Sequence, residues 1–319
     1  MRRRDFLKRP AGVCLMPVLA ACRRARGVFP SDSIHLLIPF TVGSGTDREA
    51  RDIIPYLRPR LQVPVVVENA PGADGSMAMS RLARADPDCY LLAYYGIPSM
   101  ILTELASKAR YRVGDFSHIF GWIRENLLLV TRADKWHDLA SFLAEGRRRR
   151  LTAAVPSLNS TGRLAGLLLA RETGMRCGWI PFGGSNAALA ALLGGHVDFS
   201  VAVTATCLPL VHSGRLRPML VFADERDAMC PDAPTPAELG YRVPGLPVLR
   251  GVAAPPGAPA ARLRLLEEAF RSAVSDPGFL EQAKRTGTPV FPMPAAEYRR
   301  EVESYYRMME AIRDLKPST

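Results

Sequence analysis

The sequence lacks an apolar run long enough to cross a bilayer. The N-terminal apolar stretch, residues 11–21, has eleven residues, about half of the roughly 20 that a spanning helix needs. The composition of disordered or collagen-like chains is also missing, because the 25 glycines and 27 prolines follow no three-residue period and 48% of the 319 residues are hydrophobic. These absences favour a globular protein with apolar material for two domains or one large one.

Cysteine and histidine are scarce, and neither is spaced like a set of metal ligands. The six cysteines contain no CxxC pair and the five histidines no HExxH motif, so we expect no metal site. We also expect no cofactor, because the sequence has no GxxxxGK motif and no complete dinucleotide fingerprint. Two interpretations stay open for Cys177, Cys207 and Cys230: disulfide pairing, or burial as small apolar side chains, which we favour.

Positive charge exceeds negative charge, with 42 Lys and Arg against 31 Asp and Glu and a formal net charge of +11. Such an excess indicates an anionic partner. Much of it lies in residues 1–26 and in residues 147–150, which are four consecutive arginines. Because no basic helix with interleaved aromatic residues is present, we do not expect nucleic acid as a partner.

The N-terminus has the layout of an export signal, which we assign to residues 1–26. Cationic residues precede the apolar run, and small residues follow it. Residues 3–8, RRDFLK, resemble a twin-arginine export motif, and residues 19–22, LAAC, resemble a bacterial lipobox with Cys22 as the lipidated residue. We therefore expect a periplasmic protein that contacts the membrane through a lipid anchor at Cys22; the alternative is an ordinary cysteine beside a cleavage site.

Strand-like and helix-like segments alternate along the rest of the chain, which is typical of parallel βα units. Nearly continuous apolar runs such as IHLLIPF indicate strands buried on both faces. Strands are predicted at residues 34–40, 63–67, 90–94, 127–130, 151–155, 179–182, 197–203 and 218–222. Helical spacing predicts helices at residues 47–61, 163–173 and 187–193, and Pro55 and Pro59 are expected to kink or shorten the first. The fold class predicted is α/β, with two mixed, mostly parallel sheets flanked by helices.

The last part of the chain has a different pattern. Residues 253–259, AAPPGAP, are typical of a linker or a cluster of turns. After them, an apolar stripe from Leu263 to Ala273 predicts one helix, Asp276 with Pro277 starts a second, and a stripe from Tyr298 to Ile312 predicts a third.

Three short polar turns each follow a predicted strand and precede a predicted helix. They are residues 41–47 (TVGSGTD), 155–163 (VPSLNSTGR) and 183–186 (GGSN). Glycine permits positive φ and close approach, and the N–H groups at the start of a helix attract anions. Each turn alone could be an ordinary helix cap. Their recurrence favours a site for a carboxylate or another small anion.

At these turns the sequence resembles the Bug family, the extracytoplasmic solute-binding proteins of tripartite tricarboxylate transporters. The resemblance is carried by PFTVGSGTD (39–47), PVVVENAPGADG (64–75), ADPDCYLL (85–92), PFGGSNAALAALLGGHVD (181–198), GRLRPMLV (214–221) and GVAAPPGAP (251–259). These segments occur in order and cover nearly all of the chain after the export signal.

The resemblance implies a two-lobed periplasmic-binding-protein architecture of type II (Venus flytrap). Residues 27–128 plus 254–319 would form lobe one and residues 129–253 lobe two, and the chain would cross between them near residues 127–130 and 249–254. A small organic carboxylate would bind between the lobes and pass to membrane permease subunits. The ligand-binding residues implied are Thr41, Val42, Gly43, Ser44, Gly45, Thr46, Asp47, Ser160, Thr161, Arg163, Gly183, Gly184, Ser185 and Asn186.

Several positions depart from the family pattern. Gly183 stands where a larger residue is usual, residues 162–163 are Gly-Arg in place of Thr-His, and Asp74 and Cys89 replace glycines. The identity of the ligand stays open for this reason. Asp47 either receives an ammonium group of the ligand or caps the following helix.

Two alternatives belong to other classes of protein. One is a ligand-sensing module for a receptor kinase, which the sequence does not separate from transport. The other is a periplasmic hydrolase with Ser44 or Ser185 as nucleophile; the lack of a base adjacent in sequence argues against it. We expect a binding protein and not an enzyme.

Overall fold

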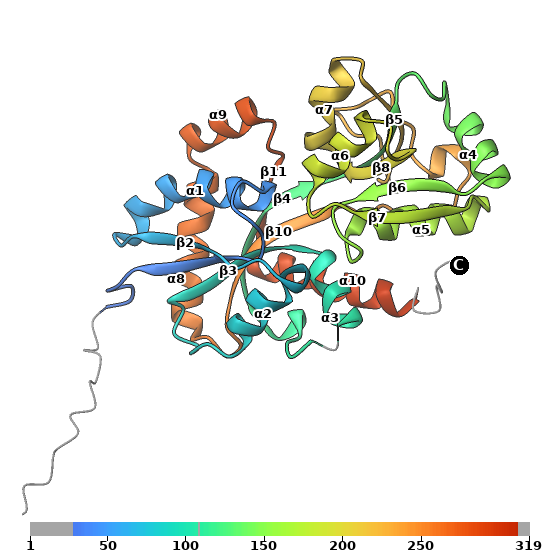
Figure 1. Ribbon diagram of the computed structural model, residues 1–319. Helices are drawn as coiled ribbons and strands as arrows, with labels where there is room; N and C mark the ends of the chain where they lie inside the picture. The colour runs from blue at the N-terminus through green and yellow to red at the C-terminus, as the bar shows by residue number, and fades with distance from the viewer. Residues whose placement is uncertain (1–27, 108, 312–319) are drawn as a thin grey trace, which may run out of the picture.

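The computed structural model describes residues 28–107 and 109–311, and it contains two β-sheets flanked by helices (Figure 1). The six-stranded sheet has the order β11-β4-β10-β3-β1-β2. Its strands are β1 (Ile34–Ile38), β2 (Val65–Asn69), β3 (Leu91–Ile97), β4 (Ser117–Glu125), β10 (Val248–Ala254) and β11 (Val290–Pro294). The five-stranded sheet has the order β7-β6-β8-β5-β9. Its strands are β5 (Leu127–Arg132), β6 (Leu151–Val155), β7 (Cys177–Pro181), β8 (Phe199–Val203) and β9 (Leu216–Val221).

Helices cover both faces of the six-stranded sheet. One face carries α1 (Gly45–Leu61), α8 (Ala260–Val274) and α9 (Pro277–Thr286). The other carries α2 (Ser76–Ala83), α3 (Ser99–Ala106) and α10 (Ala295–Ala311). The two faces explain the continuous apolar run of β1, because Leu36 and Ile38 pack in one cluster while Leu37 packs in the other.

The five-stranded sheet is covered in the same way. On one side, α4 (Leu139–Arg148) and α5 (Thr161–Thr173) pack against alternate residues of β5 and β6. On the other side lie α6 (Ser185–Leu193) and α7 (Thr204–His212), and a third apolar cluster fills that layer. Short 3-10 turns lie at η1 (Ala73–Gly75), η2 (Val113–Asp115) and η3 (Ala237–Leu239). The predicted α/β class with two mixed sheets flanked by helices is confirmed.

Parallel strand pairs do not predominate, so that detail of the prediction was wrong. The parallel pairs are β1–β2, β1–β3, β6–β7 and β6–β8. The antiparallel pairs are β10–β3, β10–β4, β11–β4, β5–β8 and β5–β9. Each antiparallel pair involves β5, β10 or β11. The first two of these strands carry the chain directly from one sheet to the other, so no crossover helix returns them to a parallel direction.

Of the two effects predicted for the prolines of α1, shortening was wrong, whereas a kink stays a prediction. The helix runs from Gly45 to Leu61 with Pro55 and Pro59 inside it, and is not shortened. Both prolines are exposed, as is Arg51. Proline has no N–H, so the carbonyls of Arg51 and Pro55 receive no helical hydrogen bond, and the exposure of these residues allows water to replace it.

The chain passes between the sheets twice. It leaves the six-stranded sheet at Glu125 and enters the other at Leu127, and it returns between the end of β9 and Val248. Strand β10 pairs with β3 and β4 along its whole length. The second passage therefore precedes Val248, several residues before the predicted boundary at 253–254. The division into two lobes at the predicted residues otherwise stays a prediction, and the export signal and Cys22 lie outside the described residues.

Candidate functional site

The first polar turn joins β1 to α1. Thr41, Val42 and Gly43 are exposed, and Val42 reaches 72% exposure. Ser44 caps the helix, since its Oγ accepts a hydrogen bond from the N–H of Asp47 at 3.3 Å. Because the first N–H groups of a helix have no acceptor within it, the amides of Gly45 and Thr46 remain to bind an anion.

Asp47 is the internal brace of this turn. Its Oδ2 accepts from the N–H of Gly43 at 2.8 Å, and its Oδ1 accepts from Arg51 Nε at 3.0 Å and Asn69 Nδ2 at 2.9 Å. Burial alone would raise the pKa of this carboxyl group, but the hydrogen bonds from Arg51, Gly43 and Asn69 outweigh it and lower the pKa. Ser44 and not Asp47 is the cap of α1, so Asp47 stabilises the turn before the helix; its predicted role as receiver of an ammonium group stays a prediction.

Asn69 holds the first turn in place from the neighbouring strand, and its role was not predicted. It ends β2, and its Nδ2 also donates to the carbonyl of Phe40 at 3.1 Å. Its amide oxygen accepts from Arg51 at 3.0 Å. The available signal was the polar ENA that follows the apolar run VVV, because parallel neighbours end at the same edge of a sheet.

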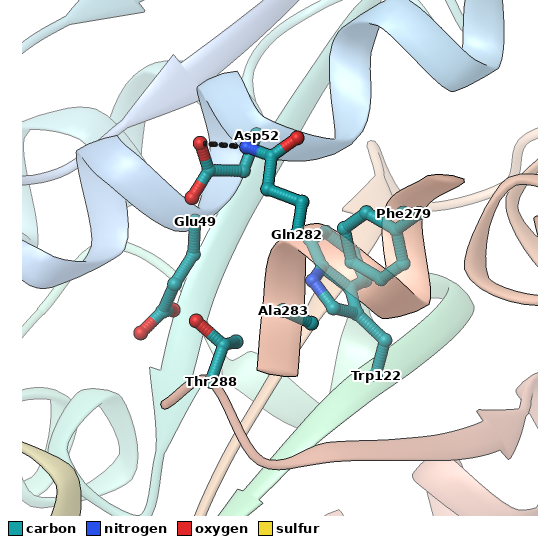
Figure 2. A pocket seen from close by; sticks show the side chains of 7 residues that line it. All are labelled: Glu49, Asp52, Trp122, Phe279, Gln282, Ala283 and Thr288. Carbon is teal, nitrogen blue, oxygen red and sulfur yellow. Dashed lines mark hydrogen bonds between the residues drawn. The ribbon is translucent and has the colours of Figure 1, made fainter. Parts of the chain in front are cut away.

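The body of α1 leads away from the turn and borders a narrow crevice (Figure 2). The crevice is lined by Glu49, Asp52, Trp122, Phe279, Gln282, Ala283 and Thr288. All of these residues lie in strands or helices of the six-stranded half, except Thr288, which lies in the loop between α9 and β11. The crevice is therefore not a space between the two sheets, and we do not assign it to the ligand.

The second polar turn joins β6 to α5, and most of its groups are already bonded. Ser160 caps α5, accepts from the N–H of Arg163 at 3.4 Å and donates its own Oγ–H to Ser157 O at 2.7 Å. The guanidinium of Arg163 donates to Leu158 O at 2.8 Å, so it braces the turn, and burial lowers its pKa. The amides of Thr161 and Gly162 stand at the start of the helix, where no helical acceptor is available.

Gly162 has a packing role in this turn. A Cβ at this position would lie 2.3 Å from the carbonyl oxygen of Val201 in β8. The departure from the family pattern at this residue therefore lets α5 approach the sheet closely.

The third polar turn joins β7 to α6 and is the most open. Gly183 has φ +75°, and a Cβ there would meet nothing within 4 Å. Gly184 precedes α6 and supplies no side-chain cap. Ser185 is half-buried, Asn186 is exposed, and the first amides of α6 carry no capping side chain. This helix start therefore offers the least obstructed set of N–H donors.

Strand pairing and one hydrogen bond bring the turns together. Strands β6 and β7 are parallel neighbours, with Val155 opposite Pro181, so the second and third turns leave the same edge of their sheet. Across from them, Asn159 Nδ2 donates to Asp74 Oδ2 at 3.0 Å. Asp74 lies in η1, beside Gly75, where a Cβ would touch Pro39 at 3.0 Å. Because β1 and β2 are parallel neighbours, η1 and the first turn leave the same edge of their sheet, and the bond to Asp74 brings the second turn to that edge.

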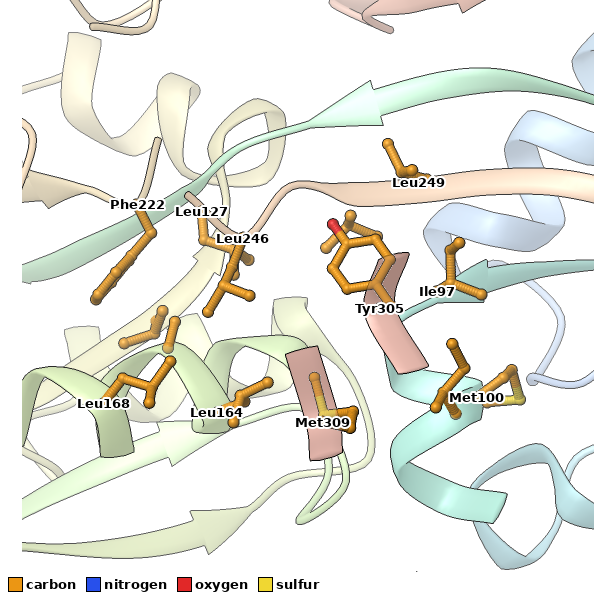
Figure 3. Packing of buried hydrophobic residues seen from close by; sticks show 14 of the residues in the cluster. Ile97, Met100, Leu127, Leu164, Leu168, Phe222, Leu246, Leu249, Tyr305 and Met309 are labelled. Carbon is orange, nitrogen blue, oxygen red and sulfur yellow. The ribbon is translucent and has the colours of Figure 1, made fainter. Parts of the chain in front are cut away.

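Apolar packing joins the two halves on the side of α10 (Figure 3). One buried cluster holds Ile97 and Met100 of the first half together with Leu164 and Leu168 of α5. In Figure 3, Met309 of α10 points toward Leu164, and Leu246 lies between Phe222 and the start of β10. Four residues of the apolar stripe that predicted this helix lie in the cluster: Tyr298, Val302, Tyr305 and Met309.

Two departures from the family pattern keep the backbone shape of glycine. Asp74 has φ +52° and Cys89 has φ +63°, which is the left-handed region that glycine occupies freely. At Asp74 this conformation directs a carboxylate toward Asn159 of the other half. The aspartate that stands in place of the usual glycine therefore supplies a hydrogen bond between the two halves.

Other chemistries find little support in residues 28–107 and 109–311. No group of three or more His, Cys, Asp or Glu side chains there could hold a metal ion, and no helix there is long and apolar enough to cross a membrane. Ser44 and Ser160 use their hydroxyls to cap helices. Cys89, Cys177, Cys207 and Cys230 are free and buried, so the interpretation as buried apolar side chains holds and the pairing of the last three was wrong.

Comparisons with known proteins agree with this geometry. Residues 50–314 match the family described as tripartite tricarboxylate transporter family receptor, TctC. BugT of Bordetella pertussis is 29% identical over 273 residues, which are 83% of this chain and 84% of BugT. The structure of the periplasmic binding protein BugD superposes with a TM-score of 0.80 at 24% identity, over 90% of this chain and 98% of that one. MatC from Rhodopseudomonas palustris with bound malate superposes with a TM-score of 0.78 at 26% identity, over 90% of this chain and 100% of MatC.

Proposed function

The chain belongs to the receptor family of the tripartite tricarboxylate transporters, and from that premise we propose that it captures a small carboxylated metabolite between its two lobes and delivers it to the membrane subunits of such a transporter. The family consists of periplasmic solute-binding proteins, so the chain is a binding protein and not an enzyme. The resemblance to the Bug family is thereby confirmed. The ligand class, the ligand-binding residues and the partner subunits are the proposal.

The three helix starts are the observation that carries the proposal. Each presents backbone N–H groups without helical acceptors, and the positive ends of α1, α5 and α6 favour an anion. The contact from Asn159 of the second turn to Asp74 of η1 lies at the edge of the six-stranded sheet that the first turn also leaves, which supports a site formed by both halves. A ligand with two carboxylates could engage both halves at once, and it would then stabilise the arrangement in which the halves are close.

The ligand class is supported by one relative. MatC, which is 26% identical and covers nearly the whole chain, was solved with malate, a four-carbon dicarboxylate. In our protein the site turns contain one basic side chain, Arg163, and its guanidinium is bonded to Leu158 O. Amides and hydroxyls would therefore carry most of the recognition.

Isothermal titration with a panel of dicarboxylates, tricarboxylates and amino acids tests the proposal. We expect at least one di- or tricarboxylate to bind with a dissociation constant in the micromolar range or below. Ser185→Trp places a bulky ring at the open start of α6 and should weaken binding at least tenfold. Ala190→Trp is the matched control, because Ala190 is an exposed residue later in the same helix. A folded protein that binds none of the panel would refute the proposed ligand class, and equal affinities of the two variants would move the site elsewhere.

The delivery partner is the finer part of the proposal. The family description names a transporter receptor, and nothing in the comparisons supports a receptor kinase. Ligand uptake by vesicles that contain the permease subunits should require the liganded protein. Uptake at the same rate without it would contradict delivery.

We also propose that residues 1–26 direct export and that Cys22 carries a lipid. The support is the sequence alone: the RRDFLK segment and the LAAC segment. Mass spectrometry of the N-terminal peptide from the membrane fraction should show an acylated Cys22, and Cys22→Ser should release the protein into the soluble fraction. An unmodified Cys22 peptide would contradict the anchor.

A further inference from the structure

Three charged side chains are buried together where the two halves join. Arg250 of β10 donates from one nitrogen, Nη1, to Glu49 Oε1 at 3.0 Å and to Glu125 Oε2 at 2.7 Å. Their side chains are 11%, 14% and 3% exposed, respectively. Tyr94 of β3 completes the group by donating its hydroxyl to Glu49 Oε2 at 2.8 Å.

The charges of this cluster do not balance. Two carboxylates converge on a single guanidinium nitrogen, so the fully ionised cluster carries one net negative charge in a poorly solvated place. Like charges that share a buried site cannot both ionise freely, and one of them takes up a proton at a higher pH than usual. The geometry therefore calls for one proton on the pair of carboxylates.

The cluster lies near the first polar turn and beside both connections between the halves. Glu49 lies on α1, five residues after Ser44, which is about 7.5 Å along a helix axis. Glu125 ends β4 just before the first connection, and Arg250 lies near the start of β10 just after the second. The intervening Asn126 is held by the other half, through Asp227 Oδ2 at 3.1 Å and the N–H of Thr204 at 2.9 Å.

The titratable groups that act on Glu49 come from four elements. They are Arg250 of β10, Glu125 of β4, Tyr94 of β3 and Arg48 of α1 itself. Burial and the charge of Glu125 raise the pKa of Glu49 to about 7, although Arg250 opposes the shift. Asp52 lines the same crevice one turn later, but its carboxylate points away from that of Glu49 and accepts from Gln282 at 2.7 Å (Figure 2).

We propose that Glu49, Glu125 and Arg250 form a proton-binding site that couples protonation of the protein to binding of the carboxylate ligand at the turn before α1. The inference rests on the proposed function, because its second half needs an anionic ligand. A ligand carboxylate at the start of α1 adds negative charge within about 10 Å of the cluster, so it favours the protonated, neutral form. By linkage, the protonated form binds the anion more tightly.

Titration of the ligand across neutral pH tests the coupling. For a dicarboxylate such as malate, which stays fully ionised, we expect binding to weaken about three- to tenfold between about pH 6 and pH 8. We also expect proton uptake on binding, seen as a dependence of the heat on the ionisation enthalpy of the buffer. Glu49→Gln keeps the cluster neutral at any pH, so it should bind tightly throughout and take up no proton.

Asp52→Asn is the matched control, because it removes a carboxylate from the same helix and crevice without touching Arg250. It should keep the pH dependence of the wild-type protein. If Glu49→Gln and the wild-type protein weaken equally between the two pH values, the coupling is refuted. Loss of the pH dependence in Asp52→Asn as well would assign the effect to the crevice as a whole and would also refute it.

A measurement without ligand separates the two proposals. If the cluster holds a proton, the melting temperature of Glu49→Gln should exceed that of the wild-type protein by a margin that grows as the pH rises from about 4.5 to about 7 and then levels off, because in this range the folded wild-type cluster keeps a proton that the unfolded chain has already lost. A margin that is constant with pH would refute the proton site whether or not any carboxylate binds. A growing margin together with no binding to any carboxylate would confirm the proton site and refute both its coupling and the proposed function.

Discussion

Asp47 shows how much one side chain can determine at a ligand turn. Its two oxygens hold the N–H of Gly43, the guanidinium of Arg51 and the amide of Asn69. Asp47→Ala would leave these donors without their acceptor, and we expect a loss of about 2–4 kcal/mol in the free energy of unfolding together with weaker ligand binding. Urea unfolding and titration with malate measure the two effects. The control is Asp86→Ala, which removes an exposed carboxylate and should change the free energy of unfolding by less than about 0.5 kcal/mol. If Asp47→Ala changes the free energy of unfolding as little as Asp86→Ala does, the turn holds its shape without the carboxylate of Asp47.

His118 makes the stability of the folded protein depend on pH, whether or not a ligand is bound. Its side chain is buried beside Tyr298, and burial lowers its pKa to about 4. The unfolded chain, with a histidine pKa near 6.5, binds the proton first, so stability should fall as the pH drops from about 6.5 to about 4, by about 3 kcal/mol in total. His118→Phe should lose this contribution, so in urea unfolding measured at several pH values the wild-type protein should lose more stability than the variant as the pH falls through this range.

The control for that experiment is a histidine on the surface. His212 is exposed at the end of α7, and His212→Phe should keep the acid slope of the wild-type protein. Glu49 contributes a slope of opposite sign, since its raised pKa makes the folded state bind the proton more tightly. An unchanged slope in His118→Phe would assign the acid sensitivity to other groups.

At the scale of elements, sequence patterns predicted those parts whose signals are local. The predicted bounds of β6 agree with the structure, and Asp276 and Pro277 mark the start of α9 as predicted. Strand β4 was missed, although all of its residues except Arg124 are buried. Its apolar pattern is interrupted by His118 and by Gly121. A Cβ added at Gly121 would lie 2.6 Å from the side chain of Met293. These residues fit the strand because of packing from α10 and β11, which no local pattern reveals.

The candidate site also has parts that local sequence patterns predicted and parts that they did not. Glycine and serine after apolar runs indicated all three turns, because helix starts have a local chemistry. The partners that fix the turns, Asn69, Asp74 and Asn159, act across 22 to 85 residues of sequence. Their roles depend on strand order and on the approach of the two halves, so they could not be assigned before the structure.

The close packing of α5 on β8 predicts that a side chain at Gly162 would displace the whole helix. Helix propensity alone would favour alanine over glycine at position 162 by about 1 kcal/mol. The Cβ of Gly162→Ala would lie 2.3 Å from Val201 O, so the helix must shift, and we expect a net loss of about 2–3 kcal/mol in the free energy of unfolding. Gly184→Ala is the control, since nothing lies within 4 Å of its Cβ and its φ is 171°. Equal thermal stability of the two variants would contradict the close approach.

At the scale of the whole molecule, the two halves are held together by contacts of different kinds. Apolar residues of α10 and α5 share one buried cluster, and the Arg250 cluster links both connections. The hydrogen bond from Asn159 to Asp74 lies instead beside the proposed ligand turns. Because it is polar and half-buried, it can break and be replaced by water at lower cost than the apolar cluster. We therefore expect this bond to be the part of the contact that opens to admit the ligand.

Removing this bond should shift the protein toward open forms without unfolding it. Asp74→Gly is the appropriate substitution, because φ +52° suits glycine and the backbone gains no strain when the carboxylate is lost. Asn159→Ala removes the donor. Each variant should enlarge the radius of gyration measured by small-angle scattering without ligand, and should weaken malate binding about two- to fivefold, since more of the binding energy must then close the lobes. The double variant should bind malate no more weakly than either single variant, because both substitutions break the same hydrogen bond. Additive losses of affinity would show that the two side chains act separately and that the bond does not hold the lobes together.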